Sequence, residues 1–152
     1  MFGYDASTLG LTATERVHMG RRAAETLGEE AQLLGAQRIF LLVSTTLRTS
    51  TNEIAEIESA LGARLAQTYD GIAAHAPRTD VLKAIEAARS VDADLIITVG
   101  GGSVTDAGKV IALGLKHNIT THEDFEGFYV FVDDNGDTVA PVFEGPDIRV
   151  IC

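Results

Sequence analysis

Short, almost continuously apolar runs are the feature that most constrains the fold of this chain. Residues 38–43 and residues 94–99 consist mainly of leucine, isoleucine, valine and phenylalanine. A strand with one solvated face alternates between apolar and polar residues, whereas a strand covered on both faces does not. Both runs are therefore predicted to be buried strands. Weaker candidate strands lie at residues 64–69, 128–132 and 148–152.

Segments with helical spacing lie between these strands. Apolar residues recur three or four positions apart in residues 21–34, 51–61, 79–90 and 104–115, which predicts four helices. Gly35 follows the first of them, where a glycine commonly ends a helix. Alternation of strand and helix predicts parallel pairing through right-handed crossovers. We therefore expect an α/β fold with an open, mainly parallel sheet and helices on both faces.

Composition argues against several classes of protein. The chain has 22 acidic and 12 basic residues and a net charge of −10, which disfavours binding to nucleic-acid phosphates. No stretch of 18 apolar residues predicts a membrane span. Residues 1–5 lack the features of a secretory signal, and the single cysteine, Cys152, cannot form an internal disulfide. We expect a cytoplasmic protein that binds neither nucleic acid nor membranes.

The residues that follow the two buried runs are candidates for ligand binding. Ligands of open α/β sheets bind beyond the carboxyl ends of the strands. Residues 44–47 read Ser-Thr-Thr-Leu, and residues 100–103 read Gly-Gly-Gly-Ser. Glycines allow a backbone to approach a ligand closely, and a helix start presents unpaired N–H groups and a positive dipole end. The glycine turn therefore suits a pyrophosphate.

The glycine turn matches neither of the two standard phosphate loops. Thr105 stands where the third glycine of the Rossmann pattern belongs, and Val110 stands where a P-loop needs serine or threonine. A purely structural interpretation also stays open. Ser103 and Asp106 have the spacing of a capping box, and Gly108 could serve close packing of a helix on the sheet.

Residues 94–112, which read DLIITVGGGSVTDAGKVIA, closely resemble the signature of the iron-containing (group III) alcohol dehydrogenase family. That family includes maleylacetate reductases, and dehydroquinate synthases are distant relatives. Its pattern is roughly aDxIIavGGGSxxDxAK, from which the chain departs mainly by Gly108 in place of alanine. The resemblance covers residues 14–116 well. Residues 44–46 and the pair His75 and Pro77 are similar to the maleylacetate reductase branch.

The resemblance implies that residues 1–152 form a single, Rossmann-like, N-terminal dinucleotide-binding domain. It places the cofactor pyrophosphate at the Gly-Gly-Ser segment, Asp106 beside the nicotinamide, and Lys109 one helical turn further on. His75 is expected only as a neighbour of the pocket. The predicted cofactor-binding residues are Gly100, Gly101, Gly102, Ser103, Asp106, Ser44, Thr45, Thr46, Leu47, Pro77 and Lys109.

The choice of cofactor follows from the residues after the first strand. Many family members have an aspartate at the position of Thr45, which contacts the adenosine ribose and repels a 2′-phosphate. Neutral hydroxyls at Ser44 and Thr45 can instead bond either a ribose hydroxyl or a phosphate. We therefore expect NADP to be accepted as well as NAD. The alternative is that these two residues simply end a strand.

The resemblance implies an NAD(P)-dependent oxidoreductase that transfers hydride to or from a metal-polarised alcohol or carbonyl. Small alcohols, aldehydes or keto-acids are the expected substrates, and a homo-oligomer is the expected assembly. The family holds Fe²⁺ or Zn²⁺ in a helical C-terminal domain, which we expect to be absent from this chain. No metal ligand and no catalytic residue is therefore expected here, and the chain alone should be inactive. A non-catalytic nucleotide-binding module and a dehydroquinate-synthase-like enzyme remain as alternatives.

An acidic segment near the C-terminus resembles a calcium loop but fits a turn better. Asp133, Asn135, Asp137 and Glu144 occupy positions one, three, five and twelve of an EF-hand loop. Thr138, however, stands where that loop needs glycine. Asn-Gly between two apolar runs predicts a hairpin, here with strands at residues 128–132 and 138–142.

Overall fold

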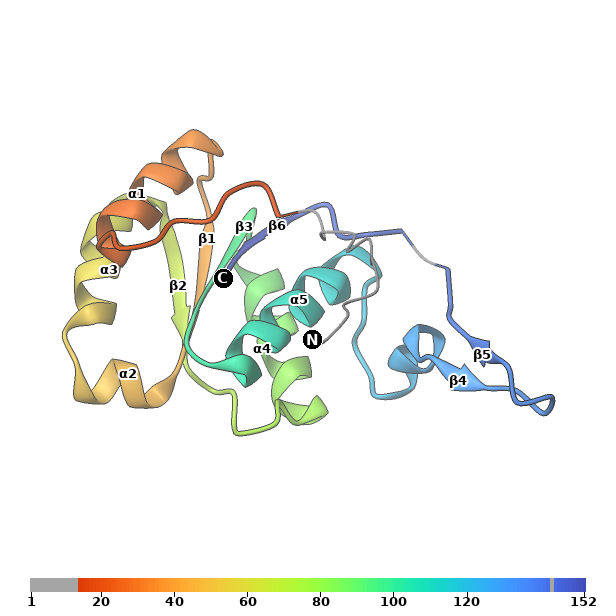
Figure 1. The fold of residues 1–152 in the computed structure, drawn as a ribbon. Helices are drawn as coiled ribbons and strands as arrows, with labels where there is room; N and C mark the ends of the chain where they lie inside the picture. The colour runs from red at the N-terminus through yellow and green to blue at the C-terminus, as the bar shows by residue number, and fades with distance from the viewer. Residues whose placement is uncertain (1–13, 143) are drawn as a thin grey trace, which may run out of the picture.

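A parallel four-stranded sheet forms the centre of the protein in the computed structural model, which describes residues 14–142 and 144–152 (Figure 1). The strand order is β2-β1-β3-β6, and each neighbouring pair is parallel. All four strands were predicted, with bounds that differ by one or two residues. They are β1 (Ile39–Val43), β2 (Leu65–Tyr69), β3 (Leu95–Val99) and β6 (Arg149–Ile151).

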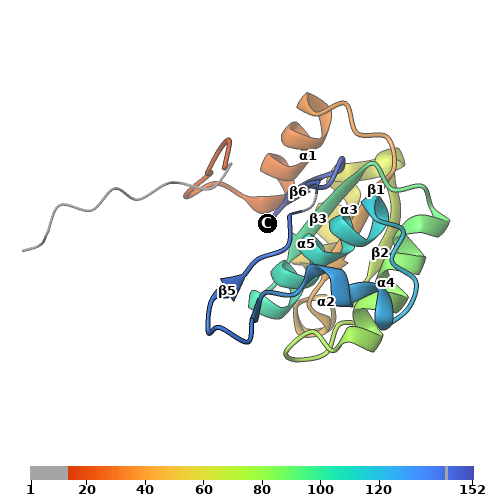
Figure 2. The same ribbon diagram turned by 90° about the vertical axis from the view of Figure 1, so that its right-hand side faces the viewer.

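Helices cover both faces of this sheet (Figure 1, Figure 2). One face packs against α1 (Ala23–Leu33) and α3 (Glu53–Leu61), and the other packs against α4 (Arg78–Ser90) and α5 (Gly102–Lys116). The four predicted helices are therefore present, and Gly35 with φ 69° follows the first of them as expected. Within the described residues, no helix has the length and apolar character needed to cross a membrane.

Successive side chains of β1 enter two different hydrophobic cores. Ile39, Leu41 and Val43 belong to the core beneath α1 and α3. Phe40 and Leu42 belong to the core beneath α4 and α5. At most 1% of each of these five residues is exposed, which explains why the sequence of this strand does not alternate. The predicted fold class, an open parallel sheet covered on both faces, is confirmed.

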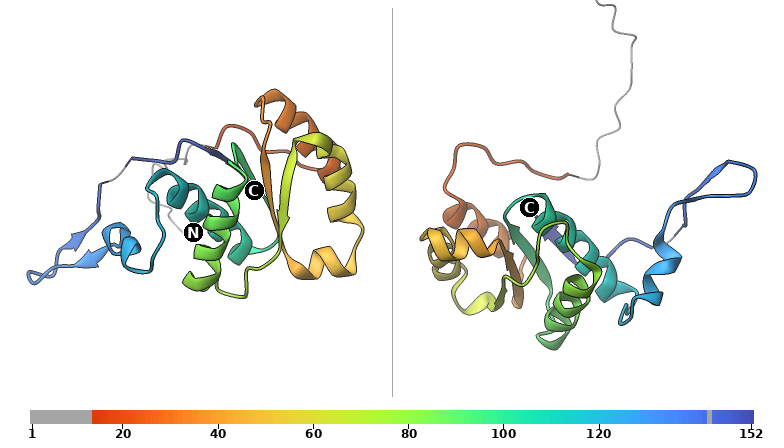
Figure 3. Two further views of the ribbon diagram at one scale, coloured as in Figure 1. Left: turned by 180° about the vertical axis from the view of Figure 1, so that it is seen from behind. Right: turned by 90° about the horizontal axis from the view of Figure 1, so that it is seen from below.

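The connections after β1 and β3 lead to opposite faces of the sheet. From β1 the chain passes through α2 (Thr45–Ser50) and α3 on one face to reach β2. From β3 it passes directly into α5 on the other face. Because β1 and β3 are neighbours, a crevice lies between the two diverging loops, and open α/β sheets bind ligands at such a point. The strands point downward in Figure 1, so the right-hand view of Figure 3 faces their carboxyl ends.

The short helix α2 was not predicted. The predicted helix at residues 51–61 begins only at Glu53, and residues 45–50 form a separate helix at the carboxyl edge of the sheet. None of the residues of α2 is buried. A hydrophobic pattern could not reveal this helix, because Leu47 is the single apolar residue among its six.

The segment after α5 differs most from its prediction. A 3₁₀ helix, η2 (Glu123–Phe128), occupies the start of the expected strand, so that only Phe131–Val132 form β4. This strand pairs antiparallel with β5 (Thr138–Val139), which confirms the hairpin but shortens both of its strands. Oδ1 of Asp133 accepts hydrogen bonds of 2.9 Å from two backbone N–H groups of the turn. The aspartate therefore closes the turn, as expected of a hairpin rather than a calcium loop.

Candidate cofactor-binding site

A cleft of about 360 Å³ opens at the carboxyl edge of the sheet. The loops after β1, β2 and β3 form its walls, so it lies at the crevice between the diverging connections. Six of the predicted cofactor-binding residues meet there. The lining consists of Ser44, Thr45, Thr46, Ile72, Ala73, Ala74, Gly101, Gly102, Ser103 and Val104.

The three glycines of the turn are needed for two different reasons. A β-carbon on Gly100 would lie 3.0 Å from Cγ2 of Val104 and 3.2 Å from Cβ of Ser44. Gly100 thus lets the loops after β1 and β3 pack against each other. A β-carbon on Gly101 or Gly102 would meet no atom within 4 Å, because both glycines face the open cleft. These two positions leave space through which a ligand can reach the backbone.

The start of α5 supplies the polar groups of this wall. Gly101 is the N-cap residue, and its carbonyl oxygen accepts hydrogen bonds of 3.0 Å and 3.1 Å from the N–H groups of Val104 and Thr105. The first N–H groups of a helix have no partner within the helix. Those of Gly102 and Ser103 therefore stand at the cleft, together with the positive end of the helix dipole.

Ser103 does not cap α5, so the capping-box interpretation is wrong. The helix begins at Gly102, which places Ser103 inside the first turn, and the N-cap makes no side-chain hydrogen bond. Oγ of Ser103 instead accepts a 2.9 Å hydrogen bond from the backbone N–H of His75. That bond leaves the serine hydroxyl proton available for donation into the cleft.

The bond to Ser103 holds an unusual segment of backbone. His75 and Ala76 have φ values of 65° and 47°, which side-chain-bearing residues seldom adopt. These residues follow the cleft-lining residues Ile72 and Ala74 and precede Pro77, the N-cap of α4. Two consecutive residues in this region indicate a loop whose shape is fixed by its surroundings.

The loops after β1 and β2 are also tied together. The hydroxyl of Thr45 donates a 2.8 Å hydrogen bond to the carbonyl oxygen of Asp70. An ion pair of 3.4 Å links Arg48 to the carboxylate of the same aspartate. The backbone N–H of Ser44 donates to the carbonyl of Val99 at 2.9 Å, which joins the loop after β1 to the end of β3. All three walls of the cleft are therefore connected by hydrogen bonds.

The remaining predicted residues lie outside the lining. Leu47 packs against the core beneath α1 and α3, and Pro77 caps α4. Asp106 and Lys109 form an ion pair of 3.2 Å on the exposed surface of α5, with 71% and 62% of their side chains exposed. Four lining residues were missed, namely Ile72, Ala73, Ala74 and Val104. The convergence of parallel strand ends at one edge is the signal that could have indicated the first three.

The donor set for a metal ion is not assembled in the described part of the chain. Among residues 14–142 and 144–152, no group of three or more His, Cys, Asp and Glu side chains could hold a metal ion. The cleft presents hydroxyls, backbone N–H groups and glycines instead. Those groups suit a phosphate and the sugars of a nucleotide rather than a transition metal.

An open parallel sheet with a glycine-lined cleft, at the point where the connections after β1 and β3 diverge, defines a Rossmann-like domain. The chain belongs to the iron-containing alcohol dehydrogenase family, whose pattern matches residues 14–145. The family expected from the glycine signature is therefore confirmed.

Characterised relatives include fungal and bacterial proteins. The protein named Dehydrogenase FUM7 from Gibberella moniliformis is 39% identical over 94 residues, which are 61% of this chain and 22% of that protein. Maleylacetate reductase 2 from Cupriavidus pinatubonensis is 36% identical over 98 residues, 64% of this chain and 26% of that protein. The chain thus matches about a quarter of the length of these relatives. The expected similarity to maleylacetate reductases is confirmed.

Solved structures of the family have the same fold. The maleylacetate reductase from Agrobacterium tumefaciens superimposes with a TM-score of 0.63 at 26% identity, over 96% of this chain and 43% of that one. The sulfoacetaldehyde reductase from Bifidobacterium kashiwanohense, solved in complex with NAD⁺, gives a TM-score of 0.65 at 15% identity. It covers 87% of this chain and 43% of that chain.

Proposed function

We propose that residues 1–152 are the cofactor-binding domain of an NAD(P)-dependent oxidoreductase of the alcohol dehydrogenase and maleylacetate reductase type. The observation that carries this proposal is the open space over Gly101 and Gly102, where the first turn of α5 meets the crevice between β1 and β3. A ligand with a pyrophosphate can approach the backbone N–H groups there without meeting a side chain.

Each wall of the cleft has a role in this proposal. The pyrophosphate accepts hydrogen bonds from the start of α5 and from the hydroxyl of Ser103. The adenosine half lies toward the loop after β1, where Ser44, Thr45 and Thr46 present hydroxyls to it and Leu47 supports them from the core. Hydroxyls at this position serve NAD and NADP alike, which supports use of both cofactors.

The other cleft edge is proposed to hold the nicotinamide half. Asp106 and Lys109 lie one and two turns along α5 from the glycine turn, and Pro77 begins α4 beside the strained loop. A bound nicotinamide cofactor supplies or accepts the hydride in this class of enzyme. The residues of this domain bind it, orient it and limit the access of water.

We propose that parts of the enzyme beyond this cleft bind the substrate and the metal. Relatives named maleylacetate reductases and alcohol dehydrogenases support a small alcohol, aldehyde or keto-acid as the substrate. We place the iron or zinc ion of the family in the portion of the relatives' length that this chain does not match, and the chain alone is then inactive. We propose further that the complete enzyme is a cytoplasmic homo-oligomer.

Titration of the full chain with NADH, followed by nucleotide fluorescence, tests this function. Saturable binding is expected, and Gly102→Ala should weaken it about tenfold or more, because one methyl group then blocks the approach of the pyrophosphate. Gly127→Ala is a matched control, since its β-carbon also meets nothing within 4 Å but lies in η2. Absence of binding, or equal affinity of the Gly102 variant and the control, would contradict the proposal.

A nucleotide-binding module without catalysis is the second candidate. It would use the same cleft and needs no metal ligand from the described residues. Measuring the length of the protein in its native host separates the two. A chain longer than 152 residues supports the oxidoreductase, whereas a natural product of 152 residues supports the module.

A further inference from the structure

Two side chains of α2 contact the same residue in the loop after β2. Thr45 donates its hydroxyl to the carbonyl oxygen of Asp70 at 2.8 Å, and Arg48 pairs with the carboxylate of Asp70 at 3.4 Å. Thr45 and Arg48 are three residues apart, so they lie on one face of the helix. Thr45 itself lines the cleft. The guanidinium of Arg48 therefore lies beside a residue that lines the cleft, and it contacts the loop after β2. Helix α2, which carries both side chains, lies at the lower ends of β1 and β2 in Figure 1.

We infer that Arg48 binds the 2′-phosphate of NADP, and that Asp70 holds its guanidinium when the cofactor lacks this phosphate. The inference rests on the proposed function, because it assumes that the adenosine ribose lies against the loop after β1. Arg48 lies outside the cleft lining, and it would bind the phosphate together with the hydroxyls of Ser44 and Thr46.

Hydroxyls can bond a 2′-phosphate, but they do not offset its charge. The chain has a net charge of −10, and a 2′-phosphate adds nearly two further negative charges. The hydroxyl of Thr45 is already engaged as a donor to Asp70. Arg48 is the sole charged residue between Val43 and Glu53. Its planar guanidinium can donate two parallel hydrogen bonds to a phosphate.

The ion pair with Asp70 is weak enough to be exchanged. The two side chains are 41% and 36% exposed, and the 3.4 Å separation is long for a charge-assisted hydrogen bond. Pairs of this kind contribute little stability, because water and salt screen them. Arg48 can therefore turn from the carboxylate to a phosphate at small cost. Asp70 in turn competes with a phosphate for the same guanidinium.

Dissociation constants of the full chain for NADPH and NADH test the inference. Arg48→Gln should weaken NADPH binding about tenfold or more and change NADH binding less than about twofold. Asp70→Asn should strengthen NADPH binding and leave NADH binding unchanged. Arg64→Gln is the matched control, because it removes the same charge at the opposite end of β2 and should alter neither constant. Added salt should also weaken NADPH binding to the wild type more than NADH binding, because salt screens the charge of Arg48.

Other outcomes overturn the inference, each in a recognisable way. Equal changes for NADPH and NADH in Arg48→Gln, or no change in either, would mean that Arg48 does not distinguish the cofactors. A wild-type chain that binds NADH but not NADPH contradicts the inference while leaving the proposed function intact. A chain that binds neither cofactor contradicts both the inference and the proposed function. If Arg48→Gln fails to fold, Arg48→Lys takes its place and should lose only part of the NADPH affinity.

Discussion

The γ-methyl group of Thr98 on β3 occupies the position that a β-carbon on Gly108 of α5 would need, since the two carbons would lie 2.2 Å apart. Both residues are buried between the sheet and the helix. The family pattern given above has alanine at the position of Gly108 and a small residue at that of Thr98. In this chain Thr98 of the strand therefore carries the methyl group that fills this space, and Gly108 of the helix has no β-carbon. Close packing of helix on sheet, the structural interpretation of Gly108, is confirmed.

Gly108→Ala is predicted to destabilise the fold. Overpacking in a core costs about 1–3 kcal/mol, of which the better helix propensity of alanine offsets about 1 kcal/mol. Thr98→Ser removes the methyl group and keeps the hydroxyl that donates to the carbonyl oxygen of Ile151 at 3.3 Å. The double variant Thr98→Ser/Gly108→Ala should therefore recover most of the loss.

Urea unfolding of the wild type, both single variants and the double variant measures this coupling. Gly127→Ala serves as the control, because its β-carbon meets no neighbour within 4 Å. If the free-energy changes of the two single variants simply add in the double variant, the two side chains do not compete for one space and the explanation fails.

Ser103→Ala is predicted to loosen the loop after β2. The variant removes the acceptor of the 2.9 Å hydrogen bond from His75, whose backbone conformation is strained. Amide hydrogen exchange at residues 71–77 should become faster, while exchange in β1 and β3 stays unchanged. Ser103→Thr keeps the hydroxyl and should preserve the protection. Unchanged exchange in Ser103→Ala would show that the loop keeps its shape without this bond.

The sheet and its covering helices could be predicted from the sequence because burial leaves a pattern in it. The runs that became β1 and β3 lack alternation because each strand contributes to two cores, as Phe40 and Leu41 show. Helix α2 left no such pattern, since none of its residues is buried. The expected strand at residues 128–132 is present only as β4, Phe131–Val132. Its apolar residues Val130, Phe131 and Val132 are 56–65% exposed, so the apolar sequence there did not indicate burial.

The residues that line the cleft could be predicted where they belong to a local turn, and less so where the cleft depends on packing between distant segments. Gly101 and Gly102 were identified because a glycine turn between strand and helix is visible in the sequence. The bond between Ser103 and His75 was not, because it joins residues 28 positions apart. Ser103 has the spacing of a capping residue, but the helix begins two residues earlier than that interpretation requires.

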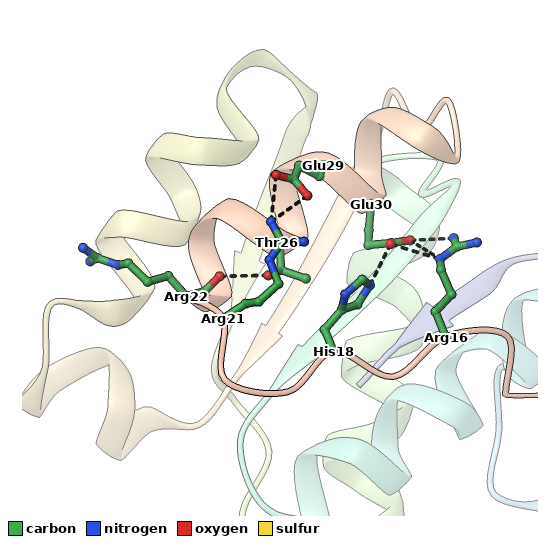
Figure 4. A network of polar contacts seen from close by, with 7 residues as sticks. All are labelled: Arg16, His18, Arg21, Arg22, Thr26, Glu29 and Glu30. Carbon is green, nitrogen blue, oxygen red and sulfur yellow. Dashed lines mark hydrogen bonds and ion pairs between the residues drawn. The ribbon is translucent and has the colours of Figure 1, made fainter.

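The segment before α1 is predicted to detach at acid pH. Arg16 and His18 both bond to the carboxylate of Glu30, and Arg21 bonds to Glu29 (Figure 4). The hydrogen bonds from Arg16, and then from His18, hold the pKa of Glu30 below its usual value. A lowered pKa in the folded state stabilises the attachment above the ordinary pKa of a glutamate, about 4.3. The attachment is lost as pH falls through the lowered value.

Amide exchange of residues 14–22, corrected for the intrinsic pH dependence, measures this attachment. Protection should persist at neutral pH and decline in acid, below the ordinary pKa of a glutamate. Glu30→Gln should lack it at every pH. Glu29→Gln, which removes only the bonds from Arg21, should keep most of it. Protection that survives in Glu30→Gln would assign the attachment to other contacts.

Asp106→Asn is predicted to affect the oxidised cofactor more than the reduced one. The nicotinamide ring of NAD⁺ carries a positive charge that NADH lacks, so a carboxylate beside it favours the oxidised form. We expect NAD⁺ affinity to fall severalfold and NADH affinity to change little. Stability should stay within about 0.5 kcal/mol, because the pair with Lys109 is highly exposed. Asp92→Asn, an exposed aspartate before β3 at the opposite edge of the sheet, is the matched control. Equal effects on NAD⁺ and NADH would mean that Asp106 lies away from the nicotinamide and is only a surface partner of Lys109.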